Sequence, residues 1–142
     1  MARADGVVCL AAAALAACAA PAYSPCPLDL GHALPADAFA RCREVLLRRY
    51  DALTESDPQS FRLQTDWAPS QDPPGERRAS VYLDPVVDDS LAVVVELRYL
   101  RLPSWFGLPG WTSPRGDAAA ERELVEELRA ALADPDPVGF TN

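Results

Sequence analysis

Residues 91–99 read Leu-Ala-Val-Val-Val-Glu-Leu-Arg-Tyr, and this stretch decides the fold of the chain. Its odd-numbered positions, from Leu91 to Tyr99, are all apolar, whereas Glu96 and Arg98 occupy even-numbered positions. A period of two residues is typical of a β-strand that buries one face and exposes the other. The stretch therefore predicts a half-buried strand of an antiparallel sheet.

Two weaker stretches share this period of two. In residues 61–67 and in residues 79–83, side chains suited to a buried face alternate with polar ones. The proline and glycine residues of 69–75 predict a loop between them, and the polar segment 84–90 predicts a tight turn. The three stretches together predict a meander of three antiparallel strands.

One amphipathic helix is expected on each side of these strands in the sequence. Residues 36–53 have apolar side chains at helical spacing, with Asp37 as the N-cap. A second helix is expected from a cap at Asp117 to about Ala133, where aspartate and proline follow. The apolar faces consist of Phe39, Cys42, Leu46, Tyr50 and Leu53 in the first helix and of Leu124, Val125, Leu128 and Leu132 in the second.

These elements predict an α+β fold. The economical arrangement is a two-layer sandwich, in which an antiparallel sheet of three to four strands has two helices packed on one face. The order is α-β-β-β-α, and the segment around Leu28 and Leu30 offers a preceding edge strand as an alternative. We expect a single domain over residues 36–134, followed by a frayed tail at 135–142.

The N-terminus has the features of a secretory leader. Arg3 and the free amine supply positive charge, residues 7–17 are apolar, and small residues follow. The apolar stretch is shorter than the roughly 20 residues of a membrane-spanning helix. It ends in Leu15-Ala16-Ala17-Cys18, which resembles the lipobox of bacterial lipoproteins. An ordinary secretory cut after Ala17 or Ala20 is the alternative.

The lipoprotein resemblance implies a signal peptide at 1–17 and a diacylglycerol on Cys18. Two or three acyl chains would hold the protein on a membrane permanently. The proline-rich residues 18–35 would form a lipidated tether that reaches up to roughly 50 Å. In this family, Ala19 rather than aspartate after the cysteine implies the outer membrane of the cell envelope, with the domain facing the periplasm.

The four cysteines are consistent with the lipoprotein interpretation. Cys9 would leave with the leader, and Cys18 would carry the lipid, which leaves Cys26 and Cys42 as a pair. In an oxidising compartment such a pair predicts a disulfide. The alternative is a buried Cys42 that acts as an apolar residue and a free thiol at Cys26.

Composition excludes several function classes. A net charge of −8 argues against a nucleic-acid partner and against electrostatic adsorption to an anionic lipid surface. All 13 basic residues are arginine, so lysine chemistry is absent. Cofactors are not expected.

Three motifs have ordinary structural explanations. His32 follows Cys26 and Asp29, but in a tether it is interpreted as a solvated histidine and not as a catalytic residue. The aspartates at 84, 88 and 89 are interpreted as turn formers, so no metal is expected. In Arg115-Gly116-Asp117, the glycine serves a turn and the aspartate a helix cap.

Aromatic side chains provide the candidate partner or ligand surface. Trp105, Phe106 and Trp111 lie in a segment rich in proline and glycine, and Trp67 is a possible fourth member. They either form an exposed apolar patch or fold back as a lid that completes the core, and we favour the lid.

The residues Leu63-Gln64-Thr65-Asp66-Trp67, with Glu76-Arg77-Arg78 opening the next strand, resemble the NlpB/BamC lipoproteins of the outer-membrane β-barrel assembly machinery. The resemblance implies a helix-grip domain, with order β-α-β-β-β-α, and a role in envelope assembly. We therefore expect a non-enzymatic lipoprotein that binds an envelope protein. The alternative is a module that holds a glycan or apolar molecule under the aromatic segment.

Overall fold

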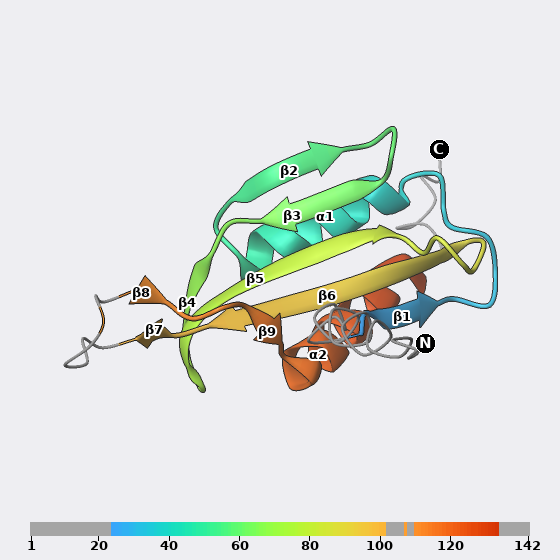
Figure 1. Ribbon diagram of the computed structural model, residues 1–142. Coiled ribbons are helices and arrows are strands. Elements are labelled where there is room, and N and C mark those ends of the chain that lie inside the picture. The colour runs from blue at the N-terminus through green and yellow to red at the C-terminus, as the bar shows by residue number, and fades with distance from the viewer. Residues whose placement is uncertain (1–23, 102–106, 108–109, 134–142) are drawn as a thin grey trace, which may run out of the picture.

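β6, the stretch with the strongest alternation in the sequence, is the strand around which the sheet is built. The computed structural model describes residues 24–101, 107 and 110–133. Figure 1 shows a twisted sheet with both helices on one of its faces. In chain order the elements are β1 (Cys26–Asp29), α1 (Ala38–Arg49), β2 (Leu53–Asp57), β3 (Arg62–Thr65), β4 (Ala68–Gln71), β5 (Pro74–Leu83), β6 (Ser90–Arg98), β7 (Leu100–Arg101), β8 (Gly110–Trp111), β9 (Arg115–Gly116) and α2 (Ala118–Ala133).

Among the described residues, seven strands form one antiparallel sheet. Its main order is β1-β6-β5-β3-β2, while β4 pairs with β5 and β9 pairs with β6. β7 and β8 form a separate two-stranded hairpin. The α+β class holds, but the prediction of a three- to four-stranded sheet in the order α-β-β-β-α was wrong because the sheet is larger.

The strands that the sequence patterns missed are short or polar. β2 reads Leu-Thr-Glu-Ser-Asp, β4 reads Ala-Pro-Ser-Gln, and β9 contains two residues. Their backbones pair with β3, β5 and β6, although none of them buries a run of large apolar side chains. Alternation of apolar residues therefore cannot detect them.

The predicted strand is present as β6, but the prediction that only one of its faces is buried was wrong, because Ala92, Val94 and Glu96 on the face away from the helices are only 2%, 5% and 8% exposed. Leu91, Val93 and Val95 are fully buried on the face that the helices cover. The register places Val93 opposite Val81 of β5, which in turn stands opposite Leu63 of β3. Helix side chains close this core, and the largest of them are Val45, Leu46, Leu124 and Leu128.

The first helix is shorter than predicted. α1 ends at Arg49, because Tyr50 has an extended backbone with φ of −131°, and Leu53 belongs to β2. Asp37 stands at the N-cap position, but its carboxylate makes no capping bond there. It accepts a hydrogen bond from Arg41 Nε at 2.7 Å instead.

The loop predicted over 69–75 is a tight hairpin between β4 and β5. Proline is tolerated because Pro69 lies in a strand off the main path of the sheet and Pro74 is the first residue of its strand. Gly75 has a φ of +149°, and a Cβ there would lie 2.3 Å from the backbone oxygen of Arg98. Only glycine fits this close approach of two strands.

The second helix begins as predicted. Asp117 Oδ1 accepts a hydrogen bond from the Ala120 N–H at 3.1 Å. Asp117 also forms an ion pair with Arg77 of β5, with 2.8 Å between Oδ2 and Nε. The cap thereby joins the start of α2 to the sheet.

β1 is the edge strand that the sequence offered as an alternative. It takes residues 26–29 into the sheet beside β6. The part of the predicted tether that precedes the domain is then residues 18–25, which span about 25 Å when extended. The predicted signal peptide 1–17, the lipidation site Cys18 and the tail 135–142 lie outside the described residues.

Candidate binding surface

The sheet has one face covered by helices and one face that no described helix covers. Figure 1 shows α1 and α2 together behind the sheet. We call the other side the open face. Its side chains come from the even-numbered positions of three adjacent strands, and they are Arg62, Gln64, Glu76, Arg78, Ser80, Tyr82, Val94, Glu96 and Arg98.

Arginines and tryptophans alternate in a stack at one end of the open face. The Arg78 guanidinium lies 4.6 Å from the centre of the Trp67 ring, and that of Arg98 lies 4.0 Å from it. Arg98 also lies 4.5 Å from the centre of the Trp111 ring. We call Trp67, Arg78, Arg98 and Trp111 the arginine–tryptophan stack. Cation–π contacts contribute about 0.5–1 kcal/mol each at exposed sites and more when desolvated.

Two glutamates hold the arginines of the stack in place. Arg78 Nε donates to Glu96 Oε2 at 2.8 Å, and Arg98 Nε donates to Glu76 Oε2 at 2.9 Å. Each pair stands directly across β5 and β6 in the sheet register. The second guanidinium nitrogen of each arginine donates to the same oxygen. The rings therefore pack on cations whose orientation is set before any partner arrives.

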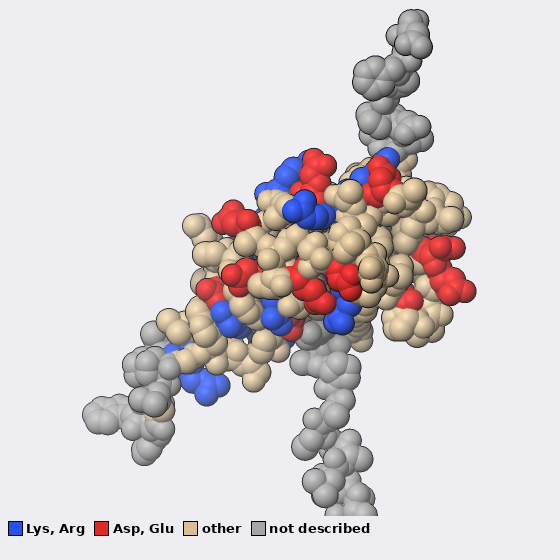
Figure 2. Space-filling view, turned by 90° about the horizontal axis from the view of Figure 1, so that it is seen from above, with Lys and Arg blue, Asp and Glu red and all other residues tan. Residues whose placement is uncertain are grey.

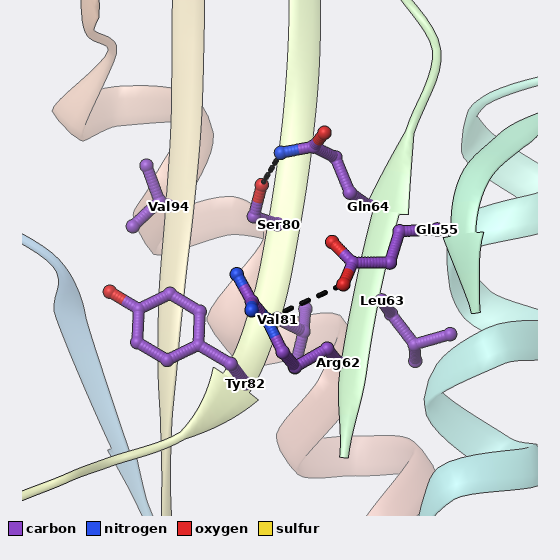
Figure 3. Close-up of a pocket in the computed structure, with 8 residues that line it drawn as sticks. All are labelled: Glu55, Arg62, Leu63, Gln64, Ser80, Val81, Tyr82 and Val94. Carbon is purple, nitrogen blue, oxygen red and sulfur yellow. Dashed lines mark hydrogen bonds and ion pairs between the residues drawn. The ribbon is translucent and has the colours of Figure 1, made fainter. Parts of the chain in front are cut away.

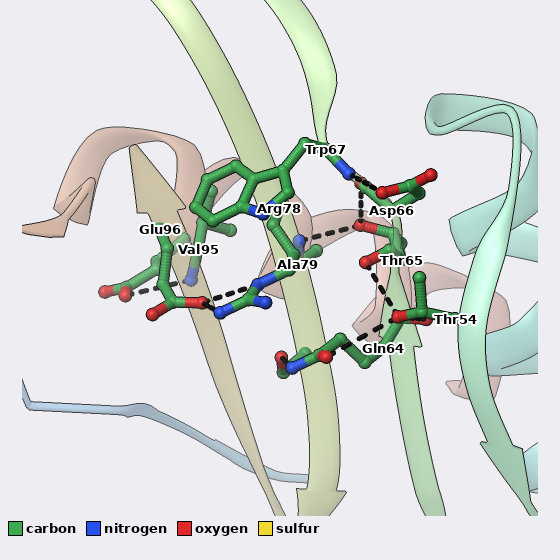
Figure 4. A network of polar contacts seen from close by, with 11 residues as sticks. Thr54, Gln64, Thr65, Asp66, Trp67, Arg78, Ala79, Val95 and Glu96 are labelled. Carbon is green, nitrogen blue, oxygen red and sulfur yellow. Dashed lines mark hydrogen bonds and ion pairs between the residues drawn. The ribbon is translucent and has the colours of Figure 1, made fainter. Parts of the chain in front are cut away.

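Trp67 reaches the stack because the chain bends sharply after β3. Buried Thr65 accepts a hydrogen bond from the Ala79 N–H and donates one to the Asp66 backbone oxygen, both at 2.9 Å. The Asp66 carboxylate then accepts a bond from the Trp67 N–H at 2.7 Å. Figure 4 shows the indole lying across β5 toward β6.

The structure brings together two of the four aromatic residues predicted for the surface. Trp111 is 44% exposed, and Trp67 is half-buried. Trp105 and Phe106 lie outside the described residues. Sequence reasoning missed the two arginine–glutamate pairs. The available signal was the repeated spacing of Glu76 with Arg78 and Glu96 with Arg98.

A shallow pocket of about 290 Å³ lies on the same open face (Figure 3). Gln64 Nε2 donates to Ser80 Oγ at 3.0 Å, and Arg62 lies 3.5 Å from Glu55. Burial, with nearby Asp84 adding to it, raises the pKa of the Tyr82 hydroxyl. The pocket therefore offers hydrogen-bond donors, acceptors and one aromatic ring. Its lining consists of Glu55, Arg62, Leu63, Gln64, Ser80, Val81, Tyr82 and Val94.

The polar residues of the other motifs are engaged in local contacts. His32 Nδ1 lies 2.9 Å from the Ala33 backbone oxygen in an exposed loop. The Asp84 carboxylate accepts hydrogen bonds from two N–H groups of its own turn. Asp117 is occupied by the cap and by Arg77. Within the described ranges, no group of three histidine, cysteine, aspartate or glutamate side chains is placed to hold a metal ion.

The two cysteines of the predicted disulfide lie in different elements. Cys26 is half-buried in β1, Cys42 is fully buried in α1, and both have free thiols in this structure. Burial raises the pKa of the Cys42 thiol to about 12. The disulfide stays a prediction, and counting thiols in unfolded, unreduced protein tests it.

Neither α1 nor α2, the helices of the described ranges, has the length and apolar character needed to cross a membrane. No protein-family model matches the chain, and a search of curated proteins also gives no match.

Proposed function

We propose that this protein is a non-enzymatic lipoprotein of the bacterial cell envelope, anchored at Cys18 in the outer membrane and facing the periplasm. In this proposal its open face binds an envelope protein. The lipobox resemblance of residues 15–18 supports the anchor. The arginine–tryptophan stack is the observation that carries the binding role.

Tryptophan and arginine dominate the residues that contribute most to protein–protein binding energy. Here Arg98 is held between two rings and paired with Glu76, so a partner would meet a surface with little side-chain freedom left to lose. Each stack arginine has a carboxylate partner. A partner would therefore gain from contact with the Trp111 ring without having to neutralise those charges.

The proposal contains no reaction step. The single histidine of the chain, His32, lies in an exposed loop. The Cys42 thiol, whose pKa is about 12, keeps its proton at neutral pH.

Cell fractionation tests the anchor. We expect Cys18→Ser to move the protein from the membrane fraction to the soluble fraction. Cys26→Ser is the matched control, and it should leave the protein in the membrane fraction. A Cys18→Ser protein that stays fully membrane-bound would contradict the lipid anchor.

Crosslinking in living cells tests the partner. We would replace Trp111 with the photoreactive aromatic residue benzoylphenylalanine, and Val86, which is 87% exposed, as the control. A discrete protein adduct is expected from position 111 and not from position 86. Adding Arg98→Gln should weaken it. The same adduct from both positions, or none from position 111, would refute the role of the stack.

The pocket on the open face supports a second candidate function, which is the holding of a glycan. Sugar rings present vicinal hydroxyls and an apolar C–H face, and the pocket supplies the Gln64 amide and the Tyr82 ring for these. Titration with soluble peptidoglycan fragments, followed by calorimetry, tests this candidate. Tyr82→Ala should abolish glycan binding, and Trp111→Ala should leave it intact. A wild-type protein that binds none of the fragments would exclude this second function.

A further inference from the structure

The charge of this protein is distributed very unevenly. The whole chain has a net charge of −8, yet residues 97–116 contain three arginines and no acidic residue. Figure 2 shows blue side chains near the end of the molecule where β7 and β8 project, and a red cluster at the opposite end. The net charge therefore does not describe the field at the hairpin end.

Two of these arginines, Arg101 and Arg115, are exposed. Arg98 pairs with Glu76, but neither Arg101 of β7 nor Arg115 of β9 has a carboxylate partner among the described residues. Arg115 lies 4.8 Å from the centre of the Tyr99 ring and donates to its hydroxyl at 2.6 Å. We call Tyr99, Arg101 and Arg115 the basic patch.

β1, the first described strand after the predicted lipid anchor, lies on the same edge of β6 as β9, which carries Arg115. β1 and β9 pair with the same edge of β6, where Cys26 stands opposite Val93 and Arg115 stands opposite Leu97. Four residues of strand separate these positions, which corresponds to about 13 Å. Because β1 is antiparallel to β6, the N-terminal end of β1 at Cys26 points toward β9.

The remaining chain is short enough to bring the patch to the membrane. Residues 18–25 reach about 25 Å when fully extended. A lipid at Cys18 would therefore keep the edge formed by β1 and β9 close to the lipid headgroups. Arginine is attracted to anionic headgroups, and tyrosine is enriched at the level of the headgroups.

We propose that the basic patch binds the anionic phospholipid surface beside the anchor and thereby orients the domain. The acidic end then points away from the membrane. This inference rests on the proposed anchor for its biological setting. The contact between patch and lipid is nevertheless measurable without the acyl chains.

The test uses the full chain with Cys18→Ser and vesicles of two compositions, phosphatidylcholine alone and phosphatidylethanolamine with phosphatidylglycerol. Flotation in 0.1 M salt is suitable, because the Debye length of about 10 Å screens the distant acidic end. We expect tighter binding to the anionic vesicles. Arg101→Gln and Arg115→Gln should each weaken it about fivefold.

Arg129→Gln in α2 is the matched control, since it removes the same charge from an exposed site outside the patch. It should change the partition coefficient less than twofold. The leader sequence is identical in all variants, so its contribution to binding cancels when the partition coefficients of two variants are divided. Equal binding to both kinds of vesicle, or an equal loss in Arg129→Gln, would overturn the inference. That result would leave the fractionation test of Cys18 unaffected.

Discussion

Replacing Glu121 by alanine is expected to destabilise the sheet at a point where one edge of β6 has no strand partner among the described residues. On this edge of β6, the pairing with β1 extends to Val93, and the pairing with β9 starts at Glu96. Between them the Val95 N–H donates to Glu121 Oε1 at 3.1 Å, and the Val95 backbone oxygen accepts from the Asp117 N–H at 2.8 Å. A side chain of α2 thus replaces a missing strand.

The size of the effect follows from the burial of this bond. Glu121 is 4% exposed, so its removal leaves the Val95 N–H buried without an acceptor. Such a loss costs about 1–3 kcal/mol. With an m-value of about 1–3 kcal/mol per molar urea, the unfolding midpoint should fall by about 1 M. Glu121→Gln keeps an acceptor oxygen, so it should retain most of the stability at pH 7.

The two variants also separate the hydrogen bond from the charge. Burial, with Asp117 adding to it, raises the pKa of Glu121, while the bond from Val95 opposes this rise. The folded protein therefore holds this proton more tightly than the unfolded chain. The stability gained is fully present below the ordinary glutamate pKa of about 4.3 and is lost as pH rises through the folded pKa. Wild type should thus lose stability relative to Glu121→Gln between acid and neutral pH.

Urea unfolding of the full chain, followed by circular dichroism from pH 4 to pH 7, measures both effects. Glu126→Ala is the control, because Glu126 is an exposed glutamate of the same helix. It should change the unfolding free energy by less than about 0.5 kcal/mol. The reasoning is refuted if Glu121→Ala is as stable as Glu126→Ala. It is equally refuted if wild type gains on Glu121→Gln with rising pH.

Three further outcomes follow from individual contacts. Gly75→Ala should lower stability by about 1–3 kcal/mol, because the new Cβ meets the Arg98 backbone oxygen at a positive φ; an unchanged melting temperature would contradict this. Thr65→Val should cost about 1–3 kcal/mol in urea unfolding, because the Ala79 N–H loses its acceptor, and a neutral effect would show that the bond is dispensable. In reduced protein at pH 8, mass spectrometry should find Cys42 labelled by a thiol reagent only after unfolding, since burial raises its pKa to about 12; rapid labelling of the native state would count against this.

The parts of the fold that sequence reasoning predicted are those in which apolar side chains repeat at regular intervals. Leu91, Val93 and Val95 predicted β6, and the cap at Asp117 predicted the start of α2. β2 was not predicted, because its sequence, Leu-Thr-Glu-Ser-Asp, has no apolar alternation. It is held as a strand by its pairing with β3. The β4–β5 hairpin was predicted as a loop, because proline and glycine usually indicate one.

The candidate surface was predicted only in part. Trp67 and Trp111 are chemically conspicuous in any sequence, so both were named. Their contact through Arg98 depends on the hydrogen bond between Thr65 and Ala79 and on the pairing of β7 with β8, and both join residues that are not neighbours in the sequence. The pocket is likewise formed by side chains of four strands.

Local patterns in the chain were sufficient for the α+β class, for β6 and for the start of α2, because the repeat of a strand and the cap of a helix are written in consecutive residues. The size of the sheet and the pairing of Glu76 with Arg98 arise from contacts between distant segments. The net charge of −8 argued against attraction to an anionic lipid surface. Folding decides where each charge lies, and at close range that position counts for more than the sum.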